Sequence, residues 1–326
     1  MYNANGNRYN EMKYNRCGKS GLKLSAVALG LWQNFGYDQS FANIRSMIHT
    51  AFNAGIVHFD LANNYGGGGA EVNFGRVLAD MRSYRDEMCI STKAGYGMWP
   101  GPYGDRNGSR KYLISSLDQS LGRMGLEYVD IFYHHATDPG TPIEETALAL
   151  DHIVHQGKAL YIGISNYNRA QTAEILSIFR ELKTPFVINQ PSYSMLNRWV
   201  EHDGLDDYAV EQGFGLAVYS PLHQGLLTSR YLNGIPESSR AARGNEHMIR
   251  QLEGGLLQKL QKLNELAGER GQTLSQMALA WVLRNPAVAT VIIGASRPEQ
   301  ITDNVGCIKA ADFSAEELAA IDEILK

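Results

Sequence analysis

Short runs of apolar and β-branched residues alternate along the whole chain with longer stretches of mixed polarity. Eight such runs occur, at residues 24–32, 56–62, 88–95, 128–135, 159–166, 186–190, 214–220 and 289–295. Within each run the apolar residues are nearly continuous, which indicates strands buried on both faces, as in a parallel sheet. The stretches between them have the length of helices, and several end in a glycine just before the next strand, as at Gly55, Gly125 and Gly213.

Eight strand and helix units in series predict an α/β fold, a (β/α)8 TIM barrel. We expect one barrel domain over residues 13–326, preceded by a polar N-terminal arm at 1–12 and carrying a long loop after strand seven. A loop of this length is usually functional in a compact domain. The alternative is a doubly wound Rossmann sheet, but "ALGLWQNFGYD" at the first strand lacks the G-x-G-x-x-G spacing, so the barrel is favoured.

Four consecutive glycines follow the second of these strands. Residues 66–69 lie where a strand gives way to a helix, a common place for a phosphate-binding loop. A P-loop needs Lys and then Ser or Thr after its glycines, and a dinucleotide-binding turn needs G-x-G-x-x-G. Neither spacing is met here, so we interpret the glycines as a flexible turn at the rim of the barrel.

The composition is that of an ordinary globular protein. Hydrophobic residues make up 44% of the 326 residues and charged residues 20%, and only the polar arm suggests disorder. The net charge of -4 gives no general attraction to nucleic acid or anionic membranes. No apolar run approaches the roughly 18 residues of a membrane span, and the arm lacks the apolar core of a signal peptide. We therefore expect a cytoplasmic protein with neither nucleic acid nor membrane as a partner.

The cysteines and histidines predict no metal site. Cys17, Cys89 and Cys307 are odd in number and far apart, so we expect reduced packing residues and neither disulfides nor structural zinc. His134 and His135 are adjacent, and neighbouring strand residues point to opposite faces, so both cannot bind one ion.

Polar residues gather at the carboxyl ends of the predicted strands, where barrels place their chemistry. They are Asp60, Tyr65, Lys93, His134, His135, Ser165, Asn166 and Gln190. A Tyr, a Lys, an Asp and a His at one mouth form an acid and base set, because an ammonium lowers the pKa of a phenol from its usual value of about 10. Tyr65 would then donate a proton to a carbonyl oxygen. The structural alternatives are a core tyrosine and a purely structural Asp60–Lys93 ion pair, and periodicity does not decide which histidine faces the mouth.

Six motifs in order give the chain a resemblance to the aldo-keto reductase superfamily. They are "FDLANNYG", "STKAG", "YVDIFYHH", "GISN", "YSPL" with "GLLT", and "IGASRPEQITDN". The resemblance runs from about Met12 to the C-terminus, and it is closest to bacterial L-glyceraldehyde 3-phosphate reductases and more distant from voltage-gated potassium channel β subunits. It implies a catalytic tetrad of Asp60, Tyr65, Lys93 and His135. In it, Tyr65 is the acid, Lys93 lowers its pKa, Asp60 anchors Lys93 and His135 orients the carbonyl. His134 departs from the family, in which a small or apolar residue is common before that histidine.

The same resemblance implies NADPH as the cofactor. Ser165, Asn166 and Gln190 would hold the nicotinamide amide, and Tyr219 would stack on its ring. The remaining implied cofactor residues are Trp32, Asp60, Ser220, Leu222, Gln224, Arg230, Arg240, Gly294, Ser296, Gln300, Asp303 and Asn304. Arg230 and Arg240 match basic positions near the 2′-phosphate in the channel-type relatives, and Gln300 replaces an arginine that other members have there.

The expected substrate is a small aldehyde, including L-glyceraldehyde 3-phosphate and methylglyoxal. The loop "YGMWPGPYGDRNGSRKY" resembles that of the glyceraldehyde-phosphate reductases, and its aromatic and basic residues suit a phosphorylated aldehyde. The implied substrate residues are Trp32, Tyr65, Trp99, Arg110, Lys111 and His135. The alternative for Arg110 and Lys111 is that they only begin an exposed helix.

Two other functions fit parts of the sequence. A lysine at a barrel strand end can be a nucleophile, so Lys93 would suit a Schiff-base aldolase. The channel-like relatives suggest a nucleotide-bound regulatory subunit, and a homo-oligomer is compatible with the sequence. The complete tetrad favours a reductase over both.

Overall fold

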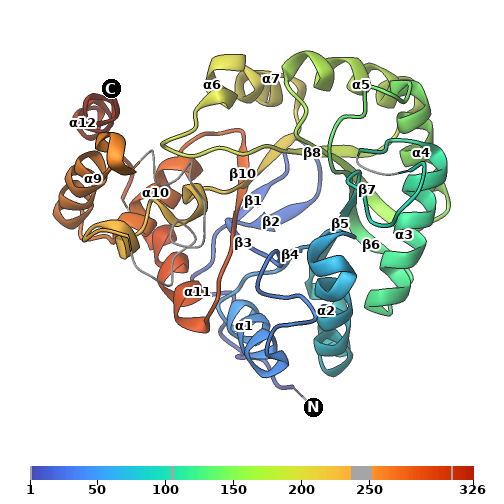
Figure 1. The fold of residues 1–326 in the computed structure, drawn as a ribbon, viewed down its shortest axis with the longest axis horizontal. Helices are drawn as coiled ribbons and strands as arrows, with labels where there is room; N and C mark the ends of the chain where they lie inside the picture. The colour runs from blue at the N-terminus through green and yellow to red at the C-terminus, as the bar shows by residue number, and fades with distance from the viewer. Residues whose placement is uncertain (1, 104–105, 236–251, 310) are drawn as a thin grey trace.

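The computed structural model describes residues 2–103, 106–235, 252–309 and 311–326. Eight parallel strands close into a barrel in the order β10-β3-β4-β5-β6-β7-β8-β9, which confirms the predicted fold (Figure 1). Each lies within or beside one of the apolar runs of the sequence. Their bounds are β3 (Val27–Gly30), β4 (His58–Asp60), β5 (Cys89–Ala94), β6 (Val129–His134), β7 (Ala159–Ser165), β8 (Phe186–Gln190), β9 (Gly215–Tyr219) and β10 (Val288–Ile293).

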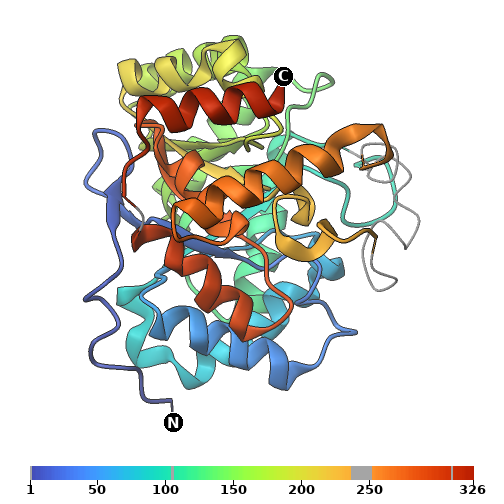
Figure 2. The ribbon, with the colours of Figure 1, turned by 90° about the vertical axis from the view of Figure 1, so that its left-hand side faces the viewer.

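Helices surround the barrel in the described part of the chain, as Figures 1 and 2 show. They are α1 (Phe41–Asn53), α2 (Gly69–Asp80), α3 (Arg110–Met124), α4 (Ile143–His155), α5 (Arg169–Leu182), α6 (Trp199–Asp203), α7 (Leu205–Gln212), α9 (Leu257–Glu269), α10 (Leu274–Leu283), α11 (Pro298–Val305) and α12 (Ala315–Leu325). Gly55, Gly125 and Gly213 adopt φ values of 84°, 65° and 82°. They therefore end helices in the left-handed conformation that the sequence predicted for them.

A two-stranded antiparallel hairpin precedes the barrel, and the sequence pattern did not predict it. It consists of β1 (Tyr14–Arg16) and β2 (Lys23–Ser25). Its turn carries Cys17, which is fully buried, and the thiol donates to the carbonyl of Val187 at 3.3 Å near the start of β8. The hairpin thus closes the amino end of the barrel, which leaves the carboxyl end as the open mouth. The apolar run at 24–32 is divided between β2 and β3.

The polar N-terminal arm packs on the outside of the barrel, although its composition suggests disorder. The ring of Tyr2 stacks on His49 of α1 with 4.1 Å between ring centroids, and its hydroxyl donates to Asn53 Oδ1 at 2.8 Å. Arg8 forms an ion pair with Glu87, and Met12 is buried. Aromatic stacking and charge pairing thus replace an apolar pattern in holding this segment.

The long loop after β9 is where the sequence predicted it. The described parts contain the 3₁₀ turns η3 (His223–Gly225) and η4 (Ser229–Tyr231) and a π-helical turn at Leu252–Leu256 before α9. Arg240 lies outside the described residues.

Three features of the composition can be compared with the structure. All three cysteines are free and buried, as expected of packing residues. No helix in the described ranges is long and apolar enough to cross a membrane. The same ranges contain no cluster of three or more His, Cys, Asp or Glu side chains that could hold a metal ion.

Candidate active site

A cavity of about 1130 Å³ opens at the carboxyl ends of the barrel strands. A volume of this size accommodates a large cofactor together with a small substrate. The cavity is lined by seventeen of the residues that the sequence singled out: Trp32, Asp60, Tyr65, His135, Ser165, Asn166, Gln190, Tyr219, Ser220, Leu222, Gln224, Arg230, Gly294, Ser296, Gln300, Asp303 and Asn304. The structure therefore brings together residues from seven of the eight strand ends.

Unusual backbone conformations concentrate at this mouth. Six non-glycine residues of the described chain have positive φ, and four of them, Gln33, Asn166, Ser220 and Gln224, line the cavity. Such conformations cost of order 1–3 kcal/mol each, and they cluster at functional sites, where the surrounding structure holds them. The clustering marks the mouth as the functional end of the barrel independently of any side-chain chemistry.

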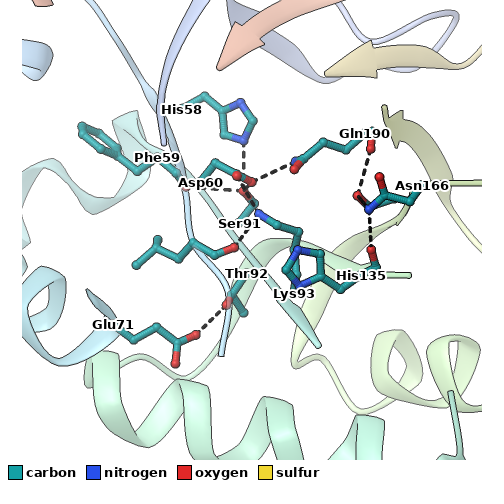
Figure 3. Close-up of polar contacts among 12 residues, drawn as sticks. His58, Phe59, Asp60, Glu71, Ser91, Thr92, Lys93, His135, Asn166 and Gln190 are labelled. Atoms are coloured by element: carbon teal, nitrogen blue, oxygen red, sulfur yellow. Dashed lines mark hydrogen bonds and ion pairs between the residues drawn. The ribbon is translucent and has the colours of Figure 1, made fainter. Parts of the chain in front are cut away.

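A buried ion pair lies at the base of the cavity (Figure 3). Lys93 Nζ is 2.6 Å from Asp60 Oδ2 and also donates to the carbonyl of Leu61 at 2.6 Å. The other carboxylate oxygen of Asp60 accepts hydrogen bonds from Ser91 Oγ at 2.8 Å and from Gln190 Nε2 at 3.1 Å. Because both charges are paired and hydrogen-bonded, the ion pair can persist without water.

A histidine lies on the far side of this carboxylate. His58 Nε2 is 3.0 Å from Ser91 Oγ, and the same hydroxyl donates to Asp60. Burial lowers the pKa of His58 to about 4, so the ring is neutral at neutral pH. His58 and Ser91 therefore fix the orientation of Asp60 without adding charge. No pattern in the sequence indicates a role for either residue.

Tyr65 is placed by the glycine turn that follows it. The turn η1 (Tyr65–Gly68) contains three successive glycines with φ of 57°, 62° and 92°, and α2 begins at Gly69. A Cβ on Gly66 would come within 2.7 Å of Gly36 Cα, so the turn packs directly against the loop after β3. None of the four glycines lines the cavity. They serve to position Tyr65 and the start of α2, as their lack of a phosphate-loop spacing indicated.

Lys93 lies beneath the ring of Tyr65, but it does not lower the pKa of the phenol. Lys93 Nζ is 5.1 Å from the Tyr65 ring centroid. Burial, followed by the negative charge of Asp60, raises the pKa of Tyr65 well above 10. The expectation of a lowered pKa is therefore wrong for this structure, because burial is the largest influence on the pKa of the phenol and Asp60 acts in the same direction. Tyr65 is consequently protonated at neutral pH.

The two adjacent histidines point to different environments. His135 lines the cavity, with its ring 5.9 Å from that of Tyr65, whereas His134 Nδ1 contacts the Tyr167 hydroxyl at 2.6 Å. Burial lowers the pKa of His134 to about 4, and burial followed by the charge of Lys93 lowers the pKa of His135 well below 6.5. Both rings are thus neutral, and His134 adds no charge to the mouth.

A chain of hydrogen bonds links the neighbouring strand ends. Asn166 Nδ2 donates to the carbonyl of His135 at 3.0 Å and to Ser165 Oγ at 3.1 Å, and Asn166 Oδ1 accepts from the Tyr219 hydroxyl at 2.7 Å. Ser165 Oγ donates to the carbonyl of Gln190 at 2.8 Å. This amide and hydroxyl cluster borders Tyr65 and His135 and can bind a carboxamide by exchanging some of these bonds.

The cavity extends from this cluster toward α11. Gly294 lines it, and a Cβ at that position would meet no atom within 4 Å, so the wall there is open. Helix α11 begins after Arg297 without a side-chain cap, and the first N–H groups of a helix favour anions. Gln300 Oε1 accepts from the Ser296 backbone N–H at 2.8 Å. A long cleft with polar side chains and a helix start at its far end fits a dinucleotide cofactor.

Three of the predicted substrate residues do not reach this cavity. Trp99 packs on Tyr112 with 5.2 Å between ring centroids, and Lys111 Nζ lies 4.9 Å from the ring centroid of Tyr103. Arg110 is exposed at the start of α3, where its backbone N–H donates to Glu145. Trp99, Arg110 and Lys111 are absent from the cavity lining, because the loop folds beside the mouth. Trp32 does line it, 50% exposed and 6.3 Å from the Tyr65 ring.

Several lining residues could not be singled out from the sequence. Tyr96 follows β5 and packs its ring edgewise on His135 with 4.6 Å between centroids. Gln33 has a φ of 64°, which no sequence pattern at that position indicates, and Arg297 borders α11. Of these three residues, only Tyr96 could have been suspected from the sequence, because it is an aromatic residue directly after a predicted strand.

Comparison with known proteins agrees with this geometry. The model of the aldo/keto reductase family matches residues 26–326. Two Escherichia coli proteins named L-glyceraldehyde 3-phosphate reductase are each 54% identical over 327 residues, covering 98% of this chain and 94% of theirs. A putative voltage-gated potassium channel subunit β of Schizosaccharomyces pombe is 37% identical over 318 residues, covering 94% of this chain and 92% of its own.

Solved structures show the same architecture. A glycerol dehydrogenase of Gluconobacter oxydans superposes with a TM-score of 0.81 at 28% identity, covering 96% of this chain and 94% of its own. The holo form of an aldo-keto reductase from Bacillus halodurans superposes with a TM-score of 0.76 at 26% identity, covering 97% of both chains. The barrel is thus shared with these structures over nearly the full length of the chain.

Proposed function

The chain belongs to the aldo/keto reductase family, an oxidoreductase family that uses NAD(P)H at a carbonyl or CH-OH group, and from that premise we propose that it reduces small aldehydes with NADPH. L-Glyceraldehyde 3-phosphate is the proposed main substrate and methylglyoxal a further one. The observation that carries the proposal is the buried Asp60–Lys93 pair directly beneath Tyr65 at the open mouth. The relatives named for L-glyceraldehyde 3-phosphate reduction support the choice of substrate, since they align over almost the whole chain.

The residues around the cavity fit the nicotinamide cofactor. Ser165, Asn166 and Gln190 would hold its carboxamide, and Tyr219 would face its ring. Gly294 and the start of α11 would receive the adenosine end, where the wall is open and helix N–H groups favour phosphate. When bound, the cofactor supplies the hydride for the carbonyl carbon.

Tyr65 is the proposed proton donor. Its hydroxyl is protonated at neutral pH, as a general acid must be before it acts, and its ring faces the cavity. The neutral ring of His135, 5.9 Å away, would donate a hydrogen bond to the same carbonyl oxygen. Lys93 would then stabilise the negative charge that remains on Tyr65 after proton transfer, and Asp60 would hold Lys93 in place.

The preference for NADPH is attributed to arginines of the long loop after β9. Arg230 is exposed and lines the cavity, and it would contact a phosphate at the adenosine end. Arg240 is proposed for the same role, although it lies outside the described residues. Gln300, which stands where other family members have an arginine, is already hydrogen-bonded to Ser296.

The two alternative functions are weaker. Lys93 is buried, paired with Asp60 and not part of the cavity lining, so it is poorly placed as an aldolase nucleophile. The likeness to channel β subunits follows from the shared family, and a regulatory subunit would not require the intact acid and base set. We further propose that the protein acts in the cytoplasm, alone or as a homo-oligomer.

An aldehyde panel tests the proposed function. Purified protein is mixed with NADPH and glyceraldehyde 3-phosphate, methylglyoxal or unphosphorylated glyceraldehyde, and nicotinamide absorbance is followed. We expect oxidation that depends on the aldehyde and is fastest with the phosphorylated substrate. Absence of turnover with every aldehyde, combined with capture of a stoichiometric membrane protein in a pull-down, would instead support a regulatory subunit.

A further inference from the structure

The loop that follows β5 returns to the barrel mouth at Arg106. Tyr96 and Arg106 are joined by an antiparallel backbone bridge, and the N–H of the next residue, Asn107, donates to the carbonyl of Gly95 at 2.8 Å. The hydroxyl of Tyr112 donates to the carbonyl of Tyr96. Backbone and side-chain bonds therefore fix Arg106 beside Tyr96, ten positions away in the sequence.

The Arg106 side chain lies over an aromatic wall of the active site. Its Cζ is 6.0 Å from the centroid of the Tyr96 ring, and that ring lies 4.6 Å from the ring of His135. The distance from the Arg106 guanidinium to the His135 ring therefore cannot exceed the guanidinium–Tyr96 and Tyr96–His135 distances taken together. Tyr96 lines the cavity and Arg106 does not, so the cation lies next to a lining residue rather than in the lining itself.

Arg106 is exposed, and no described carboxylate forms an ion pair with it. The other cations near the described mouth have different surroundings. Lys93 is buried and paired with Asp60, and Arg230 and Arg297 border the part of the cavity assigned to the cofactor. Arg106, Arg110 and Lys111 all lie outside the cavity lining, but Arg106 contacts the ring of a lining residue, Tyr96, whereas Lys111 contacts Tyr103, which does not line the cavity.

We propose that Arg106 binds the phosphate of the aldehyde substrate and so sets its preference for phosphorylated over neutral aldehydes. The inference rests on the proposed function and adds a residue to it. In glyceraldehyde 3-phosphate two carbons and one oxygen separate the carbonyl carbon from the phosphorus. A substrate of that length, with its carbonyl at Tyr65 and His135, extends along the face of Tyr96 toward Arg106. A planar guanidinium matches the paired oxygens of a phosphate.

The test compares Arg106→Gln with Arg110→Gln as a matched control in the same loop and helix start. For each variant kcat/KM is measured with glyceraldehyde 3-phosphate and with glyceraldehyde. In Arg106→Gln the ratio of the two values is expected to fall about 10- to 150-fold, the range for loss of a charge-assisted hydrogen bond. Arg106→Lys keeps the charge and should lose less, whereas Arg110→Gln should leave the ratio near wild type. An equal loss with both aldehydes, or the same change in the ratio for Arg110→Gln, overturns the proposal.

A binding measurement separates this inference from the proposed function. Calorimetry follows glycerol 3-phosphate, which has the phosphate but no carbonyl, as it binds protein saturated with NADP⁺. If wild type reduces glyceraldehyde but not its phosphate, the proposed main substrate is wrong. The assignment of Arg106 then still stands if wild type binds glycerol 3-phosphate and Arg106→Gln binds it at least about tenfold more weakly. Equal affinity of the two proteins, or no binding by wild type, contradicts the assignment.

Discussion

Lys93 Nζ lies 2.6 Å from Asp60 Oδ2, and both groups are buried beneath the ring of Tyr65. The two side chains are almost completely buried, so each charge depends on the other. Removal of one partner from such a pair costs about 3–5 kcal/mol, because the remaining charge is left buried without compensation. The ion pair therefore contributes both to the stability of the barrel and to the position of Lys93 beneath Tyr65.

Lys93→Met is therefore expected to lower the free energy of unfolding by about 3–5 kcal/mol and to reduce kcat to a degree comparable with Tyr65→Phe. The double variant Asp60→Asn with Lys93→Met should recover much of the stability, since no buried charge remains, but none of the activity. Urea unfolding and steady-state kinetics on the three proteins separate the two effects. Recovery of activity in the double variant would show that the pair is structural only.

Stability is expected to fall in mild acid because of buried neutral histidines. Burial lowers the pKa of His134 to about 4 from an ordinary value near 6.5, although Asp138 acts in the opposite direction. The unfolded chain binds this proton more readily, so the stabilisation is complete above pH 6.5 and declines as the pH falls from 6.5 toward 4. His134 alone contributes up to about 3 kcal/mol to that decline. Burial depresses the pKa of His58 to about 4 as well, so it acts in the same window.

The check is urea unfolding of wild type and His134→Asn at pH 7.5 and pH 5. The variant should lose less stability between these two values, because its side chain does not titrate. Identical losses for both proteins would mean that His134 takes up a proton in the folded state as easily as in the unfolded chain.

The glycine turn after Tyr65 offers a matched pair of substitutions. Gly66 and Gly67 both have positive φ, so alanine at either position is expected to lower the free energy of unfolding by about 1–2 kcal/mol through backbone strain. A Cβ on Gly66 would also clash with Gly36 Cα at 2.7 Å, whereas a Cβ on Gly67 meets no atom within 4 Å. Gly66→Ala should therefore displace Tyr65 and lower kcat, and Gly67→Ala should reduce stability with little effect on kcat. Equal kcat values in the two variants would indicate that the turn does not position Tyr65.

The arginines of the long loop are expected to discriminate between the two nicotinamide cofactors. Arg230→Ala should weaken NADPH binding by about 1.5–3 kcal/mol and leave NADH binding unchanged, because only NADPH carries the 2′-phosphate. Arg240→Ala is predicted to behave in the same way. Fluorescence titration of each variant with both cofactors provides an internal control. A parallel loss of affinity for NADPH and NADH would exclude contact with that phosphate.

Much of the barrel and its mouth could be predicted from the sequence. The strands from β3 to β10 are buried on both faces, so their apolar runs are continuous and easily recognised. Side chains such as Asp60 and Gln190 end those strands, and barrel topology alone places them at one mouth. The β1–β2 hairpin escaped prediction because its strands have only three residues each and include polar ones.

Other features depend on the folded environment and could not be predicted. The pKa of Tyr65 is governed first by burial and then by Asp60, and a sequence shows neither the depth of a ring nor the balance of nearby charges. The different positions of Arg106 and Arg110 depend on the backbone bridge that holds Arg106 beside Tyr96, whereas Arg110 begins α3.

The kcat of Tyr65→Phe tests the central claim most directly. The substitution keeps the ring and most of its packing against Trp32 and His135, and removes only the hydroxyl proposed to protonate the carbonyl oxygen. General acid catalysis contributes about 10²- to 10⁴-fold, so kcat with glyceraldehyde 3-phosphate should fall by that factor while NADPH affinity stays near wild type. Combining it with Lys93→Met should give little further loss, because both residues serve one proton transfer. A Tyr65→Phe protein that keeps more than about a tenth of the wild-type kcat would contradict the mechanism.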